Sequence, residues 1–235
     1  MLAPAFLSLA ALSAHAQTFT VTASVHANHH SNHDAESNST VVAWLVSQND
    51  AKPAAPIADS APKHFTLVQK NKNFDPHLLV IPVGSEVEFP NKDPFFHNVF
   101  SLFEGKRFDL GLYESGTTRS RRFDRPGISY LFCNIHSEMS AVIIALETPY
   151  YATSDRAGEI TLTNVPPGRY TLKVWKEGIS AATLKSLSRT VVVSSENVSL
   201  GNLGVPGNIP VPLAHKNKYG RDYEDPTPPG QIYDH

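Results

Sequence analysis

The segment RPGISYLFCNIHSEMSAVIIAL, residues 125–146, places three potential metal ligands between two strand-like runs. GISYLF and AVIIAL are short, rich in β-branched and aromatic residues, and bounded by Pro, Gly and Asn, as is typical of β-strands. Cys133, His136 and Met139 lie on the short stretch between them. We therefore predict a tight loop that brings a thiol, an imidazole and a thioether together at one end of a sheet.

A cysteine thiolate and two imidazoles in one plane, with a weak thioether on the axis, form the ligand set of a blue-copper electron-transfer site. The second imidazole must come from another strand end, because a short loop cannot surround an ion alone. EVEFPNKDPFFHNVFS, residues 86–101, supplies His97 after a strand and a turn that contains Pro and Asp. We expect Asn98 to form a hydrogen bond to the loop that carries Cys133 and so hold the thiolate.

Other interpretations of these residues are weaker when the residues are taken together. A single cysteine is usually a small core residue, histidine is usually a surface group, and methionine fills gaps in cores. A catalytic thiol needs a base within reach and gains nothing from a methionine. A zinc site favours more thiolate and imidazole ligands over a thioether. The combined pattern indicates one copper ion.

Most of the remaining chain has the same strand-like pattern. Short apolar and β-branched runs alternate with clusters of Gly, Pro, Asn and Asp, and no long stretch has the 3.6-residue period of a helix. The pattern predicts an all-β protein of the sandwich or barrel class. The other runs are TFTVTASV (18–25), TVVAWLV (40–46), HLLVIPV (77–83), EVEF (86–89), EITLTNV (159–165), RYTLKVW (169–175) and RTVVV (189–193).

Length and composition indicate two small domains with flanking segments. The chain has 235 residues, 41% of them hydrophobic and 18% charged, which suffices for one or two ordinary cores. Residues 49–63, rich in Pro and Ala, are interpreted as a linker. Residues 205–235 are dense in Pro, Gly and polar residues, and we expect an extended or disordered tail, or one laid along the surface through its tyrosines.

The N-terminal segment resembles an export signal. Residues 1–16 form an apolar run too short to span a bilayer, and they end in Ala-His-Ala, which fits a signal peptidase site. The positively charged start of such signals is missing, and a buried N-terminal helix is the alternative. Export predicts a bacterial periplasmic protein with no membrane insertion after cleavage. In an oxidising compartment a lone cysteine needs an explanation, and metal ligation is one.

Residues 64–148 resemble a cupredoxin of the plastocyanin and amicyanin type. The resemblance is carried by FDPHLLVIPVGSEVEFPNKDPFFHNVF (74–100) and by the 125–146 segment, whose C-x2-H-x2-M loop has the amicyanin spacing. It implies a Greek-key β-sandwich that binds one type 1 copper ion. On this resemblance His97 matches the upstream histidine, Cys133 the thiolate, His136 the loop histidine and Met139 the axial thioether.

A second resemblance concerns the rest of the chain. FDLGLYESGTTRSRRFDRPG (108–127) and NVPPGRYTLKVW (164–175) are similar to exported bacterial proteins labelled methylamine utilization proteins, which join a copper domain to a carboxypeptidase-regulatory-like module. That module implies a smaller, transthyretin-like β-sandwich. Its opening strands are absent locally, so we predict a sandwich of residues 17–48 and 149–204 with the copper domain inserted between them. Alternatively, residues 17–48 form a hairpin added to the copper domain.

The resemblance to small cupredoxins implies a docking surface for periplasmic redox proteins around the solvent-facing edge of His136. We expect Phe95 or Phe96 near this surface, with ordinary core packing as the alternative for each. The basic run between residues 104 and 125 is either a docking rim for an acidic partner or a solvated loop or edge strand. The arginines of this rim are Arg119, Arg121 and Arg122.

The histidine-rich stretch HANHHSNH favours a solvated loop over a metal site, because it is polar and has no fixed scaffold. Its histidines are His26, His29, His30 and His33. The formal net charge of −2 gives no reason to expect a nucleic-acid partner or a membrane-surface partner.

Three classes of function remain. The first is a periplasmic carrier that transfers single electrons between redox partners and is not an enzyme. The second is copper storage or delivery, and the third is a structural or interaction module with an incidental metal site. Multicopper oxidases and nitrite reductases are disfavoured, because their extra copper centres use H-x-H pairs and this sequence contains none.

Overall fold

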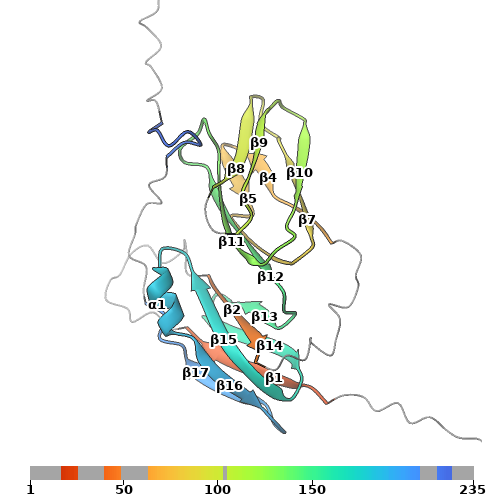
Figure 1. Cartoon of the computed structure of the whole chain (residues 1–235), viewed down its shortest axis with the longest axis vertical. Helices are drawn as coiled ribbons and strands as arrows, with labels where there is room; N and C mark the ends of the chain where they lie inside the picture. Colours follow the sequence, from red (N-terminus) through yellow and green to blue (C-terminus); the bar gives the residue numbers. More distant parts are fainter. Residues whose placement is uncertain (1–16, 26–39, 49–62, 103–104, 207–215, 224–235) are drawn as a thin grey trace, which may run out of the picture. The chain divides into compact units, whose positions relative to one another are not determined.

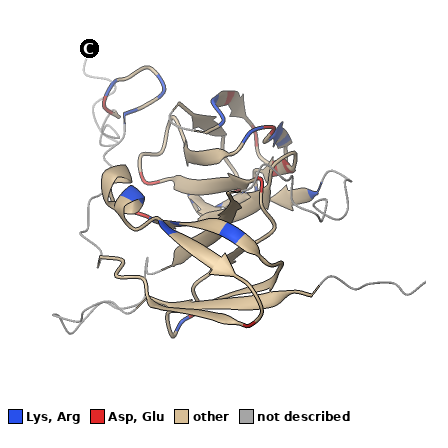
Figure 2. Ribbon diagram, turned by 60° about the horizontal axis from the view of Figure 1, so that its bottom comes forward, with Lys and Arg blue, Asp and Glu red and all other residues tan. Residues whose placement is uncertain are grey.

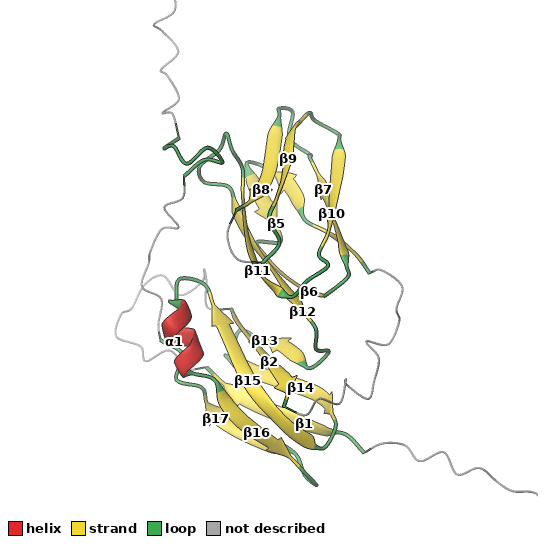
Figure 3. Ribbon diagram, viewed as in Figure 1, coloured by secondary structure: helices red, strands yellow, loops and turns green. Residues whose placement is uncertain are grey.

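The computed structural model describes residues 17–25, 40–48, 63–102, 105–206 and 216–223. Nearly all regular structure in this part of the chain is β (Figure 3), which confirms the all-β prediction. The exception among these residues is the short helix α1 (Ala181–Ser186), whose N-cap Ser180 accepts a hydrogen bond from the backbone of Thr183. The expected signal peptide, nearly all of the expected linker and the four clustered histidines lie outside the described residues.

The described strands fall into two compact units, each with its own hydrophobic core. We call residues 63–149 together with 216–223 the inserted unit. The described residues of 17–48 and 150–206 form the split unit. No helix in the described part of the chain is long and apolar enough to cross a membrane. Basic and acidic residues occur on both strands and loops (Figure 2).

The inserted unit contains a five-stranded sheet of order β6-β12-β11-β8-β9 and a three-stranded sheet of order β10-β7-β3 (Figure 1). A two-stranded ribbon, β4-β5, accompanies them. The bounds are His64–Thr66 (β3), Val68–Lys70 (β4), Asn73–Asp75 (β5), Leu78–Pro82 (β6), Glu86–Pro90 (β7), His97–Ser101 (β8), Phe108–Tyr113 (β9), Thr118–Arg122 (β10), Gly127–Phe132 (β11) and Ser140–Leu146 (β12).

The 125–146 segment forms the centre of the five-stranded sheet. β11 and β12 are an antiparallel pair in which Phe132 lies opposite Ser140, so residues 133–139 are the hairpin loop. β12 also pairs with β6 in parallel, and Ala141 to Leu146 are all buried. A strand with neighbours on both sides and both faces covered has a continuous apolar sequence, and AVIIAL is such a run. The hairpin therefore joins the 133–139 loop directly to the buried strand β12.

The split unit has sheets of order β14-β1-β17 and β13-β2-β15-β16. Every second side chain along β1 and most of β14 is buried, as expected of strands with one face on the core. The core of the unit includes Val21 of β1, Leu45 of β2 and Leu172 of β15. Both strands of residues 17–48 pair in these sheets with strands after residue 150. The bounds are Phe19–Ser24 (β1), Val41–Ser47 (β2), Tyr151–Thr153 (β13), Glu159–Val165 (β14), Gly168–Lys176 (β15), Arg189–Val193 (β16) and Val198–Asn202 (β17).

Candidate metal centre

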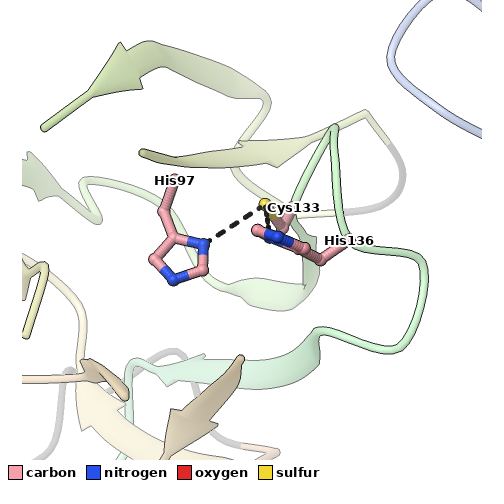
Figure 4. Close-up of side chains that lie close together, drawn as sticks. All are labelled: His97, Cys133 and His136. Carbon is pink, nitrogen blue, oxygen red and sulfur yellow. Dashed lines mark hydrogen bonds between the residues drawn. The ribbon is translucent and has the colours of Figure 1, made fainter. Parts of the chain in front are cut away.

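Three potential ligand atoms converge at one end of the inserted unit (Figure 4). Cys133 Sγ lies 3.8 Å from His97 Nδ1 and 3.6 Å from His136 Nδ1. All three ligand atoms lie within 4.8 Å of one another. Among the residues that the structure describes, this is the one group of three or more His, Cys, Asp or Glu side chains that are close enough to hold a metal ion. The structure therefore brings the loop ligands and the distant histidine together.

Sheet ends position these three side chains. His97 is the first residue of β8, and Cys133 directly follows β11. The loop is closed by two backbone hydrogen bonds, from Cys133 N–H to the Met139 carbonyl (3.3 Å) and from Met139 N–H to the His136 carbonyl (3.2 Å). Because rigid strands hold both ends of the loop, the ligand positions are set by the fold.

Asp93 orients His97 and was not anticipated from the sequence. His97 Nε2 donates to Asp93 Oδ2 at 2.8 Å, and both residues are almost completely buried. A proton fixed on Nε2 leaves the Nδ1 lone pair free to bind a metal, which is the usual role of such outer partners. The only sequence signal was an acidic residue four positions before the histidine, in a turn.

Asp93 also holds the turn between β4 and β5. Its oxygens accept hydrogen bonds from the backbone of Asn71 (2.6 Å) and Lys72 (2.9 Å), two residues with positive φ of 54° and 55°. Burial acts to raise the pKa of Asp93, but the hydrogen bonds from Lys72, His97 and Asn71 outweigh it and hold that pKa below its ordinary value. The carboxylate is therefore ionised when it accepts from His97.

The thiol of Cys133 is fully buried in the core of the inserted unit. Burial raises its pKa, although backbone hydrogen bonds from Ile135, Asn98 and His136 oppose the shift. Burial also lowers the pKa of His136, with help from the nearby His97 and Lys72. A neutral imidazole is the form that binds metal, and a bound cation would deprotonate the thiol.

Met139 is fully buried and belongs to the same core cluster as Cys133. It is the last residue of the loop before β12, and its backbone forms hydrogen bonds with Cys133 and His136. That its thioether is a weak axial ligand stays a prediction.

Asn98 forms the expected hydrogen bond to Cys133 with its backbone and not with its side chain. Its amide group donates to Asp109 Oδ1 at 2.8 Å, whereas its backbone forms the hydrogen bond to Cys133. The reason is the alternation of side chains along a strand: His97 points toward the ligand cluster, so Asn98 points to the opposite face, where β9 presents Asp109. Asn98 still supports the thiolate, but through its main chain.

Phe95 lies beside the ligand histidines, with ring centroids 5.2 Å from His97 and 5.6 Å from His136. Phe95 and Phe96 are 37% and 54% exposed, and Ile135 in the metal loop is 45% exposed. His136 itself is half-buried. The metal end of the unit therefore carries an exposed apolar group around its most accessible ligand.

The three arginines of the predicted rim lie on β10, which pairs with β7. Arg122 is opposite Glu86, at the end of β7 that is farther from the turn leading to His97. Arg119 donates to the carbonyl of Leu110 and packs over Tyr113, and Arg121 packs over Phe108. These two arginines contact their own unit, and the structure does not gather the three around His136.

The donor atoms fit a small metal ion. Metal–nitrogen bonds of about 2.0–2.1 Å and metal–sulfur bonds of about 2.3 Å separate the two atoms by about 3.6–3.8 Å when the angle lies between tetrahedral and trigonal. The two sulfur–nitrogen distances, 3.6 and 3.8 Å, fall in this range. One thiolate, two imidazoles and a buried thioether match copper better than zinc.

Comparison with known proteins gives partial matches. Residues 144–199 match the family model described as domain II of polysaccharide lyase family 4, whereas a carboxypeptidase-regulatory-like module was expected there. A search of curated proteins gave no match.

Several solved structures are similar to part of the chain. The copper-containing nitrite reductase of Thermus scotoductus SA-01 is 28% identical, with a TM-score of 0.36, over 43% of this chain and 27% of that chain. A purple cupredoxin of Nitrosopumilus maritimus is 21% identical, with a TM-score of 0.32, over 35% and 99%. A Cu(I) amicyanin variant is 15% identical, with a TM-score of 0.34, over 35% and 82%. The similar structures thus include cupredoxins, at low TM-scores, and this chain spans about a quarter of the nitrite reductase.

Proposed function

We propose that this protein is a type 1 copper protein that transfers single electrons between redox partner proteins and makes no chemical bond. The observation that carries the proposal is the approach of His97 Nδ1 and His136 Nδ1 to within 3.8 and 3.6 Å of Cys133 Sγ. A His₂Cys set with a weak axial methionine is the ligand set of electron-transfer copper. Bound copper would supply the one-electron chemistry.

The residues of the chain have separate tasks in this proposal. His97, Cys133 and His136 would hold the ion, with Met139 as the axial ligand. Asp93 fixes the tautomer and orientation of His97. The buried Cys133 and His97 exclude water from the site, and the sheet ends keep the ligands in one arrangement for both oxidation states. The half-buried His136 would be the route of the electron to the surface.

The partners and the location of the protein are part of the same proposal. Phe95, Phe96 and Ile135 form an apolar patch beside His136, suited to transient docking with a small interface. The N-terminal sequence supports export to the periplasm, where such partners would be redox proteins. From the sequence resemblance we also propose that the protein is of the methylamine utilization type; this resemblance does not identify the electron donor or the electron acceptor.

The direct test is the visible spectrum of the copper-loaded protein. The wild type should show an intense thiolate-to-copper band, and Cys133→Ser should lack it. His64→Ala is a matched control, because His64 is exposed and lies outside the ligand cluster. A wild type without the band, or a Cys133→Ser variant that keeps it, would exclude the proposed site.

Copper storage or delivery is the second candidate function. A carrier should retain its ion through repeated reduction and reoxidation in the presence of a mild chelator, whereas a delivery protein should lose it on reduction. A structural module with an incidental site predicts that Cys133→Ala leaves the cellular phenotype unchanged.

A further inference from the structure

A short C-terminal segment, residues 216–223, packs on the inserted unit near the metal loop. The segment holds its own shape: Asn217 N–H donates to the carbonyl of Arg221 (2.8 Å), and Asn217 Oδ1 accepts from the backbone of Tyr219 (3.0 Å) and Arg221 (3.1 Å). Gly220 supplies the positive φ of 75° that the turn needs. The turn therefore presents the flanking side chains in fixed directions.

Two hydrogen bonds join this segment directly to the metal loop. The Tyr223 hydroxyl donates to the Cys133 carbonyl at 2.7 Å, and the backbone N–H of Lys218 donates to Asn134 Oδ1 at 3.0 Å. The N–H of Cys133 already donates to Met139. Both backbone polar groups of Cys133 are therefore held, one by the loop itself and one by the C-terminal segment.

A third connection reaches Cys133 indirectly, through Asp109 of β9 and Asn98 of β8. Lys218 Nζ forms an ion pair with Asp109 Oδ2 at 2.8 Å, and the other Asp109 oxygen accepts from Asn98 at 2.8 Å. The backbone of Asn98 forms the hydrogen bond to Cys133 described above. Lys218 is thereby linked to Cys133 through β9 and β8.

We propose that residues 216–223 are a positioning strap that holds the Cys133–Met139 loop closed, with Tyr223 and Lys218 as its positioning residues. The inference deepens the proposed function and rests on it for the identity of the metal. The strap acts on the loop whether or not a metal is bound, because all of its contacts are between protein groups. When copper is bound, a closed loop would keep the sulfur in place and slow the loss of the ion.

The test measures how fast iodoacetamide alkylates Cys133 in the full-length, metal-free protein. Cys133 is the only cysteine of the chain and is fully buried, so alkylation reports opening of this one loop. Tyr223→Phe and Lys218→Met should each increase the rate about two- to tenfold, the effect of losing one net hydrogen bond or partly exposed ion pair. Lys216→Met is a control in an exposed position of the same segment and should stay within about twofold of wild type.

Low concentrations of urea separate a strap from general stabilisation. Loop opening exposes little surface, so the faster alkylation of Tyr223→Phe should hardly depend on urea, whereas global unfolding depends on it steeply. Rates equal to wild type in both strap variants, or acceleration only with a steep urea dependence, would overturn the inference.

The copper-loaded variants give a second, independent readout. Tyr223→Phe should shift the thiolate-to-copper band and release copper to a chelator faster, and Lys216→Met should do neither. If the wild type forms no such band, the proposed function fails, while the alkylation rates still decide whether the strap exists.

Discussion

Replacing Asp93 with alanine should weaken both the inserted unit and its metal site. The carboxylate accepts three hydrogen bonds, from His97 Nε2 at 2.8 Å and from the backbone of Asn71 and Lys72 at 2.6 and 2.9 Å. Asp93→Ala removes all three acceptors and frees the His97 ring to rotate or to change its tautomer.

The magnitude follows from the exposure of the three donors. A hydrogen bond to a charged group contributes about 1.5–3 kcal/mol. Asn71 and Lys72 are exposed, so water replaces the acceptor for those two amides at little cost. His97 is fully buried, and its Nε2 would be left without a partner. We expect a loss of about 2–4 kcal/mol in the free energy of unfolding, and a loss of about 10- to 100-fold in copper affinity.

The assay needs a probe of the inserted unit. Both tryptophans of the chain, Trp44 and Trp175, lie in the split unit, so their fluorescence does not follow the inserted one. Urea unfolding of the metal-free variant should therefore be followed by the accessibility of the Cys133 thiol, and copper affinity by competition with a chelator.

A surface ion pair provides the matched control for Asp93. Asp124 pairs with Lys106 at 2.8 Å but is 55% exposed, so Asp124→Ala should cost less than about 1 kcal/mol and leave copper affinity unchanged. An Asp93→Ala protein that loses less than about 1 kcal/mol and binds copper like wild type would refute the role assigned to this carboxylate.

Three further outcomes are expected. Burial acts to raise the pKa of Asp109, but hydrogen bonds from Lys218, the Gly111 backbone and Asn98 outweigh it and lower the pKa in the folded protein. Ionised Asp109 therefore stabilises the fold fully above the unfolded pKa of about 3.9, and this stabilisation is lost as the pH falls through the folded pKa. The difference in urea midpoint between wild type and Asp109→Asn should therefore shrink below about pH 4, and a constant difference would contradict this. Leu172→Ala should lower the free energy of unfolding of the split unit by about 2–5 kcal/mol, because Leu172 is fully buried in its core. Urea unfolding followed by tryptophan fluorescence measures this loss, and a smaller loss would show that the core collapses around the gap. Phe96→Ser should keep the thiolate-to-copper band but slow electron exchange with a partner in stopped-flow measurements; an unchanged rate would remove Phe96 from the docking patch.

The sequence predicted the parts of the site that depend on short-range spacing. Cys133, His136 and Met139 lie on one hairpin loop, so their proximity follows once β11 and β12 are recognised. His97 required only a strand end and a chemical need for a second imidazole. The strand-like runs were recognisable because alternation or continuous apolar character reflects burial directly.

The features of the site that the sequence did not predict depend on contacts between distant segments or on polar residues of common types. Asp93 resembles any turn carboxylate until the fold brings Asn71 and Lys72 to it. Alternation along β8 directs the Asn98 side chain to Asp109, so the hydrogen bond to Cys133 comes from the backbone of Asn98, which does not depend on the residue type. The partners of the β10 arginines follow from contacts with β9 that no local pattern specifies. Residues 216–223 lie in a tail for which packing along the surface through its tyrosines was one of the expectations, and the hydrogen bond from Tyr223 to Cys133 agrees with it. The partners of the segment could not be predicted from its sequence, although the Asn-x-x-Gly turn is a local signal.

The division of the split unit has a consequence for biosynthesis. About a hundred residues separate the end of β2 at Ser47 from the start of β13 at Tyr151. At about 5–20 residues per second, β1 and β2 are translated some 5–20 seconds before the strands that pair with them, and their unpaired edges need protection from aggregation during that interval. The inserted unit emerges complete in its strands within this time, and residues 216–223 follow only after the strands of the split unit. A product that ends before Tyr151 would therefore carry unpaired edges on β1 and β2, and its 133–139 loop would lack the contacts of residues 216–223.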